Sequence, residues 1–280
     1  MKNMYENQWC LFPHFMGTGA FFKEKHGSSL IYLFQVIKMF LRKISLLRDE
    51  IPSFDHYPFS IPSLKNIDEI HLESDVTFFV GENGSGKSTL LEAIADKCDF
   101  NTAGGGRNNT YDVYAADSAL SEYIRLSWLP KTTNGFFLRA ESFYSFATHI
   151  DEVDETGFRD YGGRSLHKQS HGESFLSLFL NRFRENSIYL LDEPEAALSP
   201  ARQLTFLKII HDLVANGNAQ FIIATHSPIL LGYPNADILS FDEGQITKIE
   251  YEMTDHYQLT KYFLQHRERF LSELFKDDES

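Results

Sequence analysis

Cysteine is scarce in this chain of 280 residues, where Cys10 and Cys98 are the only two. Neither belongs to a CxxC pair or to a cysteine and histidine spacing, so the sequence contains no disulfide framework and no zinc motif. Basic residues are outnumbered, because 26 Lys and Arg stand against 39 Asp and Glu and give a formal net charge of -13. This balance excludes a surface that coats nucleic acid through charge alone, while a local basic groove remains open.

A hydrophobic run long enough to span a membrane is missing as well. The apolar stretch 28–41 is too short for a span, carries Gln35 and Lys38, and has no small-residue cleavage site. The sequence also has no internal repeat and no heptad run. We therefore predict a cytoplasmic protein, in a reducing compartment, without a membrane span.

The residues that are present suit one folded domain. Hydrophobic residues make up 42% of the chain and aromatic residues 14%, which is enough for a well-filled core. Residues 1–36 have no clear periodicity and are expected to form an irregular N-terminal extension. The domain itself is expected over residues 37–280.

Short apolar runs alternate with helical spacing along most of this domain. Strands are expected at 76–80, 188–191 and 220–225, and helices at 87–97, 175–183 and 200–214. This alternation predicts an α/β fold with a mostly parallel central sheet and helices on both sides. Other expected elements are an antiparallel β layer from strands at 39–47 and 67–72, a loop at 101–109, short strands or a strand and a helix at 118–131 and 136–141, a hairpin at 241–249 and an amphipathic helix at 255–275.

The most specific motif joins the expected strand at 76–80 to the helix after it. Residues 81–88 read GENGSGKS and fit the P-loop pattern G-x-x-x-x-G-K-[ST]. Its glycines let backbone N–H groups face phosphates, while the lysine reaches the outer phosphates and the serine binds magnesium. A chance glycine-rich turn is the alternative, and the flanking strand and helix argue against it. The predicted ATP-binding residues are Gly81, Glu82, Asn83, Gly84, Ser85, Gly86, Lys87, Ser88 and Thr89.

Polar residues also follow the two later buried strands. Asp192 and Glu193 come directly after the strand at 188–191, at the end where α/β sheets bind ligands. Asp192 is predicted to bind magnesium, and Glu193 to orient or deprotonate the attacking water. His226 follows the strand at 220–225 and is predicted to contact the γ-phosphate. The alternative for the acid pair is an ordinary strand-end turn, and the alternative for His226 is a structural role. The catalytic candidates are Glu193, His226 and Lys87.

Together with residues 169–173 (QSHGE), these motifs resemble the ABC ATPase superfamily. In that family, a Ser-Gly-Gly-Gln/Glu signature closes over the γ-phosphate bound by the opposing subunit. Ser170, Gly172 and Glu173 match it, whereas His171 replaces the first glycine and Gln169 the usual leucine. The resemblance covers about residues 40–250 and implies a P-loop NTPase of the ABC-head type, with ATP and Mg²⁺ as ligands and an ATP-dependent homodimer. A simple helix cap is the alternative for the pentapeptide alone.

Other elements of the family are matched less closely. Residues 195–200 resemble its dimer-contact loop, with Ser199 in place of the usual aspartate. Glu141 is the nearest candidate for its Q-loop residue, and hence for a further magnesium ligand. Candidates for stacking on adenine, with core packing as the alternative, are Phe54, Tyr57 and Phe59.

The short insert before the signature, at 142–169, narrows the class. Transporter subunits of the family carry a helical subdomain there, and its DNA-repair and chromosome-organising members carry a long coiled coil. The chain is therefore most similar to compact AAA/ABC-type ATPases of bacteria, related to RecF, SMC and SbcC-like heads. This resemblance implies a switch acting on DNA or a protein partner, in DNA repair or phage defence. The alternatives are the ATP-binding subunit of a transporter and a binding-only regulatory module.

A basic cluster lies within this insert. We interpret it either as a solvated surface or as a contact for phosphate or nucleic acid. Its members are Arg159, Arg164, His167 and Lys168.

Overall fold

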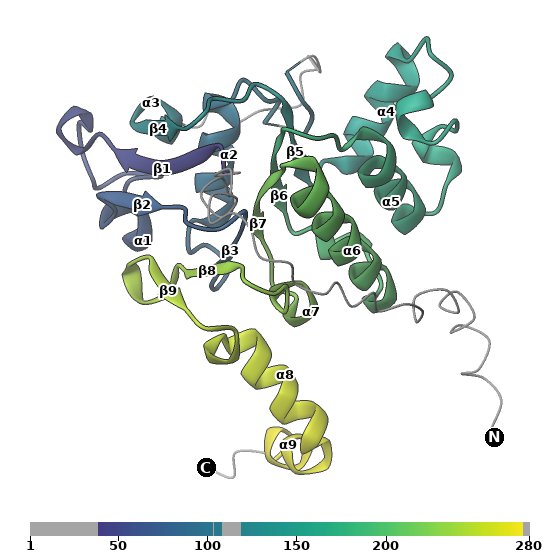
Figure 1. Ribbon diagram of the computed structural model, residues 1–280. Coiled ribbons are helices and arrows are strands. Elements are labelled where there is room, and N and C mark those ends of the chain that lie inside the picture. Colours follow the sequence, from purple (N-terminus) through teal and green to yellow (C-terminus); the bar gives the residue numbers. More distant parts are fainter. Residues whose placement is uncertain (1–38, 103, 108–118, 277–280) are drawn as a thin grey trace, which may run out of the picture. The chain divides into compact units, whose positions relative to one another are not determined.

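The computed structural model describes residues 39–102, 104–107 and 119–276 (Figure 1). The predicted extension at 1–36, with Cys10 and most of the apolar stretch 28–41, lies outside the described residues. Part of the loop expected at 101–109 lies outside them as well. Among the described helices, none combines the length and the apolar character that crossing a membrane requires.

Two separate β-sheets are present in the described part of the chain. One is antiparallel, with the strand order β2-β1-β4, and the other has six strands in the order β5-β6-β7-β3-β8-β9. In the larger sheet every neighbouring pair is parallel except β8 and β9. The strands are β1 (Leu41–Leu46), β2 (Glu69–His71), β3 (Val76–Val80), β4 (Ile124–Trp128), β5 (Gly135–Arg139), β6 (Ile188–Asp192), β7 (Gln220–Ala224), β8 (Asp237–Ser240) and β9 (Thr247–Ile249).

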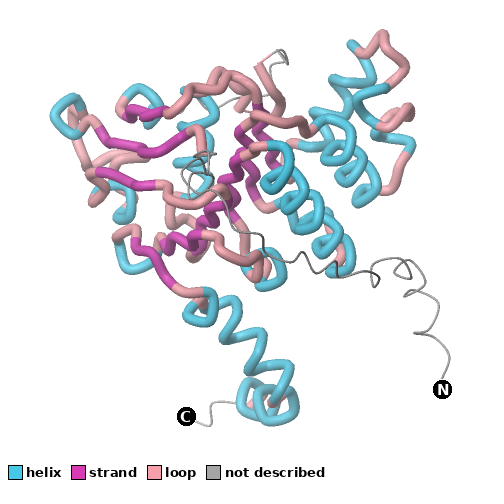
Figure 2. Tube along the Cα trace, in the orientation of Figure 1, coloured by secondary structure: helices cyan, strands magenta, loops and turns pink. Residues whose placement is uncertain are grey.

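Helices flank the larger sheet on both faces, as the sequence predicts (Figures 1 and 2). The α-helices of the described residues are α1 (Pro62–Lys65), α2 (Lys87–Lys97), α3 (Ala119–Glu122), α4 (Phe143–Val153), α5 (His171–Arg182), α6 (Pro200–Gly217), α7 (Pro228–Leu231), α8 (Asp255–Gln265) and α9 (Arg267–Leu274), of which α8 and α9 project away from the sheet (Figure 1). Short 3₁₀ helices occupy 48–50, 159–161, 166–168, 194–197, 242–244 and 251–253.

The core has two layers because alternate residues of a strand point to opposite faces of the sheet. Phe78 of β3 packs in a cluster with Phe175 of α5 and Phe206 of α6. Its neighbour Phe79 packs in the other cluster with Leu90 of α2, and that cluster also contains residues of β1 and β4. Helix α2 therefore lies between the two sheets, and α5 and α6 lie on the opposite face.

The central strands are buried on both faces, which explains their apolar sequences. All five residues of β3, β6 and β7 are buried. Parallel strands covered by helices on both sides require such continuous apolar runs. The three strands are neighbours and run in the same direction, so the residues that follow them meet at one edge of the sheet.

Several element boundaries differ from the sequence prediction. Helix α5 begins at His171 rather than at Phe175, because Ser170 caps it. The first strand of the C-terminal hairpin begins earlier, at Asp237, and residues 242–244 form a 3₁₀ turn. The prediction of a single helix at 255–275 is wrong in one respect. The segment forms two helices, which are divided at His266, where φ is -129° and ψ is 33°. Helix α4, inside the insert, was not predicted.

Candidate active site

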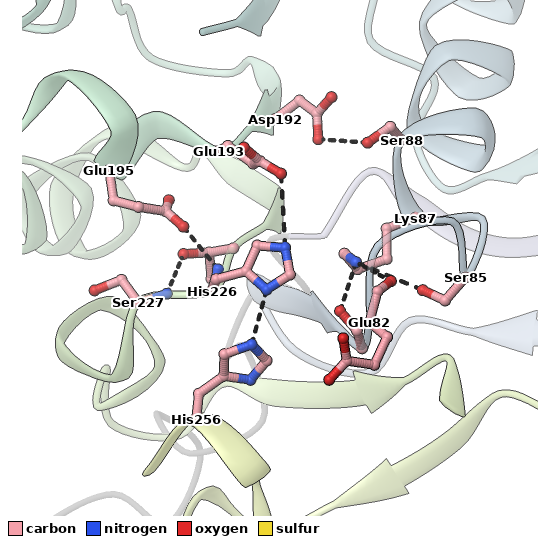
Figure 3. A network of polar contacts seen from close by, with 12 residues as sticks. Glu82, Ser85, Lys87, Ser88, Asp192, Glu193, Glu195, His226, Ser227 and His256 are labelled. Carbon is pink, nitrogen blue, oxygen red and sulfur yellow. Dashed lines mark hydrogen bonds and ion pairs between the residues drawn. The ribbon is translucent and has the colours of Figure 1, made fainter. Parts of the chain in front are cut away.

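Three predicted motifs converge at the carboxyl edge of the larger sheet (Figure 3). The P-loop follows β3, Asp192 ends β6, and His226 comes two residues after β7. Because β7 pairs with both β3 and β6, these segments are neighbours in space as well. Ligands of open α/β sheets bind at this edge.

The P-loop depends on glycine at two positions. Gly86 has a φ of 102°, and a Cβ there would lie 3.1 Å from the Leu64 side chain and 3.2 Å from that of Ile61. Gly81 has a φ of 140°, and its Cβ would lie 2.9 Å from the carboxylate of Asp242. Helix α2 starts immediately after Gly86 without a side-chain cap. Its first N–H groups can therefore bind an anion, as helix N-termini do.

Lys87 lies inside this loop and is 4% exposed. Its Nζ donates to the backbone oxygens of Gly81 at 2.6 Å and Glu82 at 2.9 Å. Burial lowers the pKa of Lys87, while the nearby charge of Asp192 opposes that shift. The loop is fixed from outside by Asp242, whose Oδ1 accepts the Glu82 N–H at 2.9 Å. The sequence motifs gave no sign of Asp242.

The two predicted magnesium ligands from the P-loop and β6 are in contact. Ser88 Oγ donates to Asp192 Oδ1 at 3.0 Å. Asp192 is 5% exposed, and burial raises the pKa of its carboxyl group to about 6. No group of three or more His, Cys, Asp or Glu residues that could hold a metal occurs in the described ranges. A hydroxyl beside one buried carboxylate fits magnesium, which binds one or two carboxylates and takes its remaining ligands from water and phosphate.

Arg139, at the end of β5, contacts three acidic residues near Ser88 and Asp192. Its guanidinium contacts Glu92 of α2, lies 3.2 Å from Glu141 and has its Nε 3.8 Å from Asp192 Oδ2. Burial raises the pKa of Glu92, and the charge of Arg139 opposes that shift. Glu141 is exposed and pairs with Arg139, and its assignment as a magnesium ligand stays a prediction. Sequence motifs did not reveal Arg139.

Glu193 adopts a left-handed backbone conformation, with φ 51° and ψ 50°. Its N–H donates to the Ala224 carbonyl of β7 at 2.9 Å, which fixes the turn after β6. The side chain is 44% exposed, and Oε1 lies 3.6 Å from His226 Nε2. A carboxylate with this exposure is accessible to a water molecule.

His226 has polar neighbours on three sides. Its N–H donates to Glu195 Oε1 at 2.6 Å, its Nε2 faces Glu193, and its Nδ1 lies 2.8 Å from His256 Nε2 (Figure 3). Burial lowers the pKa of His226, and burial is also the main reason why the pKa of His256 is lowered. No sequence pattern indicates His256, because it belongs to α8 and is remote from every motif.

The predicted signature forms the N-terminus of α5. The Ser170 N–H donates to Glu173 Oε2 at 3.0 Å, and the two residues form a capping box. A Cβ on Gly172 would collide with the Arg202 side chain and lie 2.9 Å from the Ala197 carbonyl. The side chain of His171 lies outside what the structure describes. The signature therefore has the structure of a helix cap in which Ser170 and Glu173 are exposed and Gly172 is buried.

The upstream aromatic residues differ in their surroundings. Phe59 is 7% exposed and packs edge-on against Phe54 and Tyr123, with ring centroids 6.4 and 5.1 Å away. Tyr57, in contrast, is 70% exposed, and its hydroxyl lies 3.3 Å from Thr89 Oγ1. Phe59 is thus a core residue, and Tyr57 alone of these aromatics lies open beside the P-loop helix.

The basic cluster of the insert is on the surface. Its four members, Arg159, Arg164, His167 and Lys168, are exposed. His167 packs on α4, where its Nε2 lies 3.0 Å from Thr148 Oγ1. The structure therefore leaves both interpretations of the cluster open.

Two family models match separate parts of the chain. The model "AAA domain, putative AbiEii toxin, Type IV TA system" matches residues 76–158, and the model "AAA ATPase domain" matches residues 162–231. The first match contains the P-loop. The second contains the capped helix α5, the acid pair and His226.

Curated relatives and solved structures are similar over most of their lengths. The petrobactin import ATP-binding protein FpuD of Bacillus anthracis is 26% identical, over 64% of this chain and 73% of the relative. The hemin import ATP-binding protein HmuV of Aliivibrio fischeri is 26% identical, over 69% and 82%. Similar structures include the SMC head domain from Thermotoga maritima, with a TM-score of 0.43, 20% identity and coverage of 76% and 100%. The ADP conformation of MJ1267, an ATP-binding cassette of an ABC transporter, has a TM-score of 0.43, 15% identity and coverage of 85% and 99%.

Proposed function

We propose that this chain, an ATPase of the ABC/AAA type, binds ATP with magnesium at its P-loop and hydrolyses it between two copies of itself docked head to tail. The two family matches and the ATP-binding relatives confirm the ATPase family that the sequence motifs indicate. Our proposal concerns the site shared between two copies, the role of each residue in it, and the process that ATP hydrolysis drives.

The observation that carries the proposal is the position of the signature helix. Helix α5 packs through Phe175 on one face of the sheet, and the P-loop helix α2 packs through Leu90 on the other. The first turn of α5, with exposed Ser170 at its cap, therefore belongs to the opposite face of the sheet from the P-loop helix of its own chain. In a head-to-tail pair, the same turn can meet the phosphates bound by the opposite copy, where its N–H groups would stabilise negative charge.

The residues of the P-loop edge suit the binding of a nucleoside triphosphate. Lys87 would exchange its bonds to the Gly81 and Glu82 carbonyls for bonds to the outer phosphates. Ser88 and Asp192 would hold magnesium, which neutralises charge that develops on the phosphates. The raised pKa of Asp192 supports this role, because a buried carboxylate gains from a cation in its vicinity.

The chemistry of hydrolysis falls to Glu193 and His226. The exposed Glu193 carboxylate would orient a water molecule and accept its proton as the water attacks the γ-phosphate in line. His226 Nε2, which is buried and without a hydrogen-bond partner in the structure, would donate to a γ-phosphate oxygen. The first residue acts on the nucleophile and the second on the phosphate.

A complementation experiment tests the composite site. Lys87→Ala removes the phosphate contact, and Ser170→Arg blocks the signature, so each variant alone should lose turnover. An equimolar mixture should regain about a quarter of the wild-type rate, because half of the dimers are mixed and each mixed dimer has one intact site. If the mixture is no more active than its components, the assignment of the signature to the opposite copy is wrong.

We further propose that the ATP-driven dimer acts as a switch on DNA or on a protein partner, in a process such as DNA repair or phage defence. The exposed basic cluster around Arg164, close to the signature helix, supports a phosphate-bearing partner. Duplex DNA added to the wild type should then raise turnover, and Arg164→Glu should reduce this effect while basal turnover is unchanged. An equal response of both proteins would remove the support from this cluster.

The ATP-binding subunit of a transporter is the second candidate, because the curated relatives are import ATP-binding proteins. This function requires a membrane partner, whereas the switch does not. Isolation of the tagged chain from membranes together with an integral membrane protein would favour the transporter, and its recovery without one would favour the switch.

A further inference from the structure

We propose that His256 is a positioning residue that holds the His226 ring with its proton on Nε2, the nitrogen that faces Glu193 and the phosphate site. The proposal rests on the assignment of His226 to the γ-phosphate made above. No motif contains His256, and it belongs to a helix outside the P-loop sheet.

The contact between the two rings determines where the protons lie. His226 Nδ1 and His256 Nε2 are 2.8 Å apart, which is a hydrogen-bond distance and requires a donor and an acceptor. The pKa of each imidazole is lowered, so both rings are neutral near pH 7 and only one proton lies between them. Either His256 donates to His226, or His226 donates to His256.

The far side of the His226 ring decides between these arrangements. If His226 donated from Nδ1, its Nε2 would be a bare acceptor 3.6 Å from the Glu193 carboxylate, which is also an acceptor. If His256 donates, His226 Nε2 carries the proton and attracts that carboxylate. The second arrangement replaces a repulsion with an attraction. It also leaves a buried Nε2–H without a hydrogen-bond partner, beside Glu193 and therefore available to a phosphate oxygen bound at this edge.

The structure around His256 keeps it in place. Thr254, which is 1% exposed, caps α8 and accepts the Tyr257 N–H, so His256 lies in the first turn of a capped helix. Tyr251, just before this helix, donates from its hydroxyl to the Pro228 carbonyl at 2.8 Å, two residues after His226. The start of α8 and the His226 loop are therefore joined by a second hydrogen bond. By contrast, none of the residues of α8 and α9 is buried, so these two helices, which we call the C-terminal arm, contribute no side chain to the hydrophobic core.

Steady-state ATPase assays of four variants test the proposal. His256→Ala should lower kcat about tenfold, the effect of losing one orienting hydrogen bond, and leave KM within about twofold because the P-loop still holds the nucleotide. His256→Gln carries an amide N–H that can replace the Nε2 donor, so it should recover most of the rate. His266→Ala, in the same arm, is the matched control and should behave like the wild type. His226→Ala reports on the proposed function itself.

The outcomes distinguish a failure of the His226 assignment from a failure of the positioning role of His256. Wild-type turnover in His226→Ala would overturn the assignment of His226, and with it this part of the proposed function. Loss of turnover in His226→Ala together with wild-type kcat in His256→Ala would overturn the positioning role alone. A glutamine variant as slow as the alanine variant would also contradict that role.

A spectroscopic measurement tests the tautomer independently of turnover. Ring nitrogen-15 spectra of the histidine-labelled protein distinguish a protonated from an unprotonated nitrogen, and His226→Ala assigns the signal. The proposal expects His226 to be protonated on Nε2 in the wild type and to become a mixture of tautomers in His256→Ala. A wild-type ring protonated on Nδ1 would overturn it.

Discussion

Ser88 Oγ donates a hydrogen bond to Asp192 Oδ1 at 3.0 Å, which joins the first turn of α2 to the carboxyl end of β6. The acceptor is buried, and that burial raises its pKa to about 6. The two predicted magnesium ligands therefore meet before any metal binds, and the metal-free protein bears the cost of a buried charge.

Asp192→Asn should stabilise the metal-free protein at neutral pH. The pKa of Asp192 is about 6 in the folded state and about 3.9 in an unfolded chain, so ionised Asp192 lowers the stability of the folded state. The contribution of this group becomes more favourable as the pH falls through about 6, because the folded protein then takes up a proton that the unfolded chain does not. We expect the asparagine variant to raise the free energy of unfolding by roughly 1 to 3 kcal/mol at about pH 7.5.

Urea denaturation with a chelator present measures this effect. The advantage of Asp192→Asn should shrink as the pH is lowered to about 5, where wild-type Asp192 is mostly protonated. Magnesium with ATP should stabilise the wild type but not the variant. A variant that is less stable than the wild type at neutral pH would contradict the account.

Gly86→Ala should disrupt the P-loop. The φ of 102° is unfavourable for alanine, and the new Cβ would crowd Leu64 and Ile61 at 3.1 and 3.2 Å. We expect a loss of about 1 to 3 kcal/mol of stability and at least about tenfold weaker ATP binding. Titration with a fluorescent ATP analogue and thermal melting measure the two effects.

Gly84→Ala is the matched control for the Gly86 variant. Its φ of 82° imposes similar backbone strain, but no atom lies within 4 Å of the position of its Cβ. We expect about 1 kcal/mol of destabilisation and a smaller loss of ATP binding. Equal effects at both positions would show that crowding beneath Gly86 is unimportant.

Much of the fold could be predicted from sequence because its signals are local. Strand β3 and helix α2 have the predicted bounds of 76–80 and 87–97. A buried parallel strand needs a continuous apolar run, and the P-loop motif fixes the start of the helix after it. Helix α4 is absent from the sequence prediction, although its buried residues Phe143, Phe146 and Ile150 follow helical spacing.

The convergence of the site could be predicted only in part. That Asp192 and His226 share an edge with the P-loop follows from parallel strands, and the structure brings them together. Their partners Arg139 and His256 depend on how distant segments return to that edge. No local pattern marks a residue whose role is to contact a motif from another element.

Gly172→Ala should affect turnover without affecting ATP binding. A Cβ at this position meets Arg202 and the Ala197 carbonyl, so the first turn of α5 must shift. We expect ATP affinity to be unchanged, because α2 is on the opposite face of the sheet, and turnover to fall at least about tenfold. Leu180→Ala, on an exposed position of the same helix, is the control and should have wild-type turnover. Weakened ATP binding in Gly172→Ala would contradict the separation of the two sites.

The central claim is that two copies of the chain enclose the nucleotide between them, and Glu193→Gln tests it most directly. This change removes the proposed base but leaves Lys87, Ser88 and Asp192 in place, so the variant should bind ATP and hydrolyse it very slowly. The measurement is light scattering of the wild type and the variant with and without magnesium and ATP. We expect a dimer of Glu193→Gln that forms only when both magnesium and ATP are present; a monomer under every condition would show that two copies do not enclose the nucleotide.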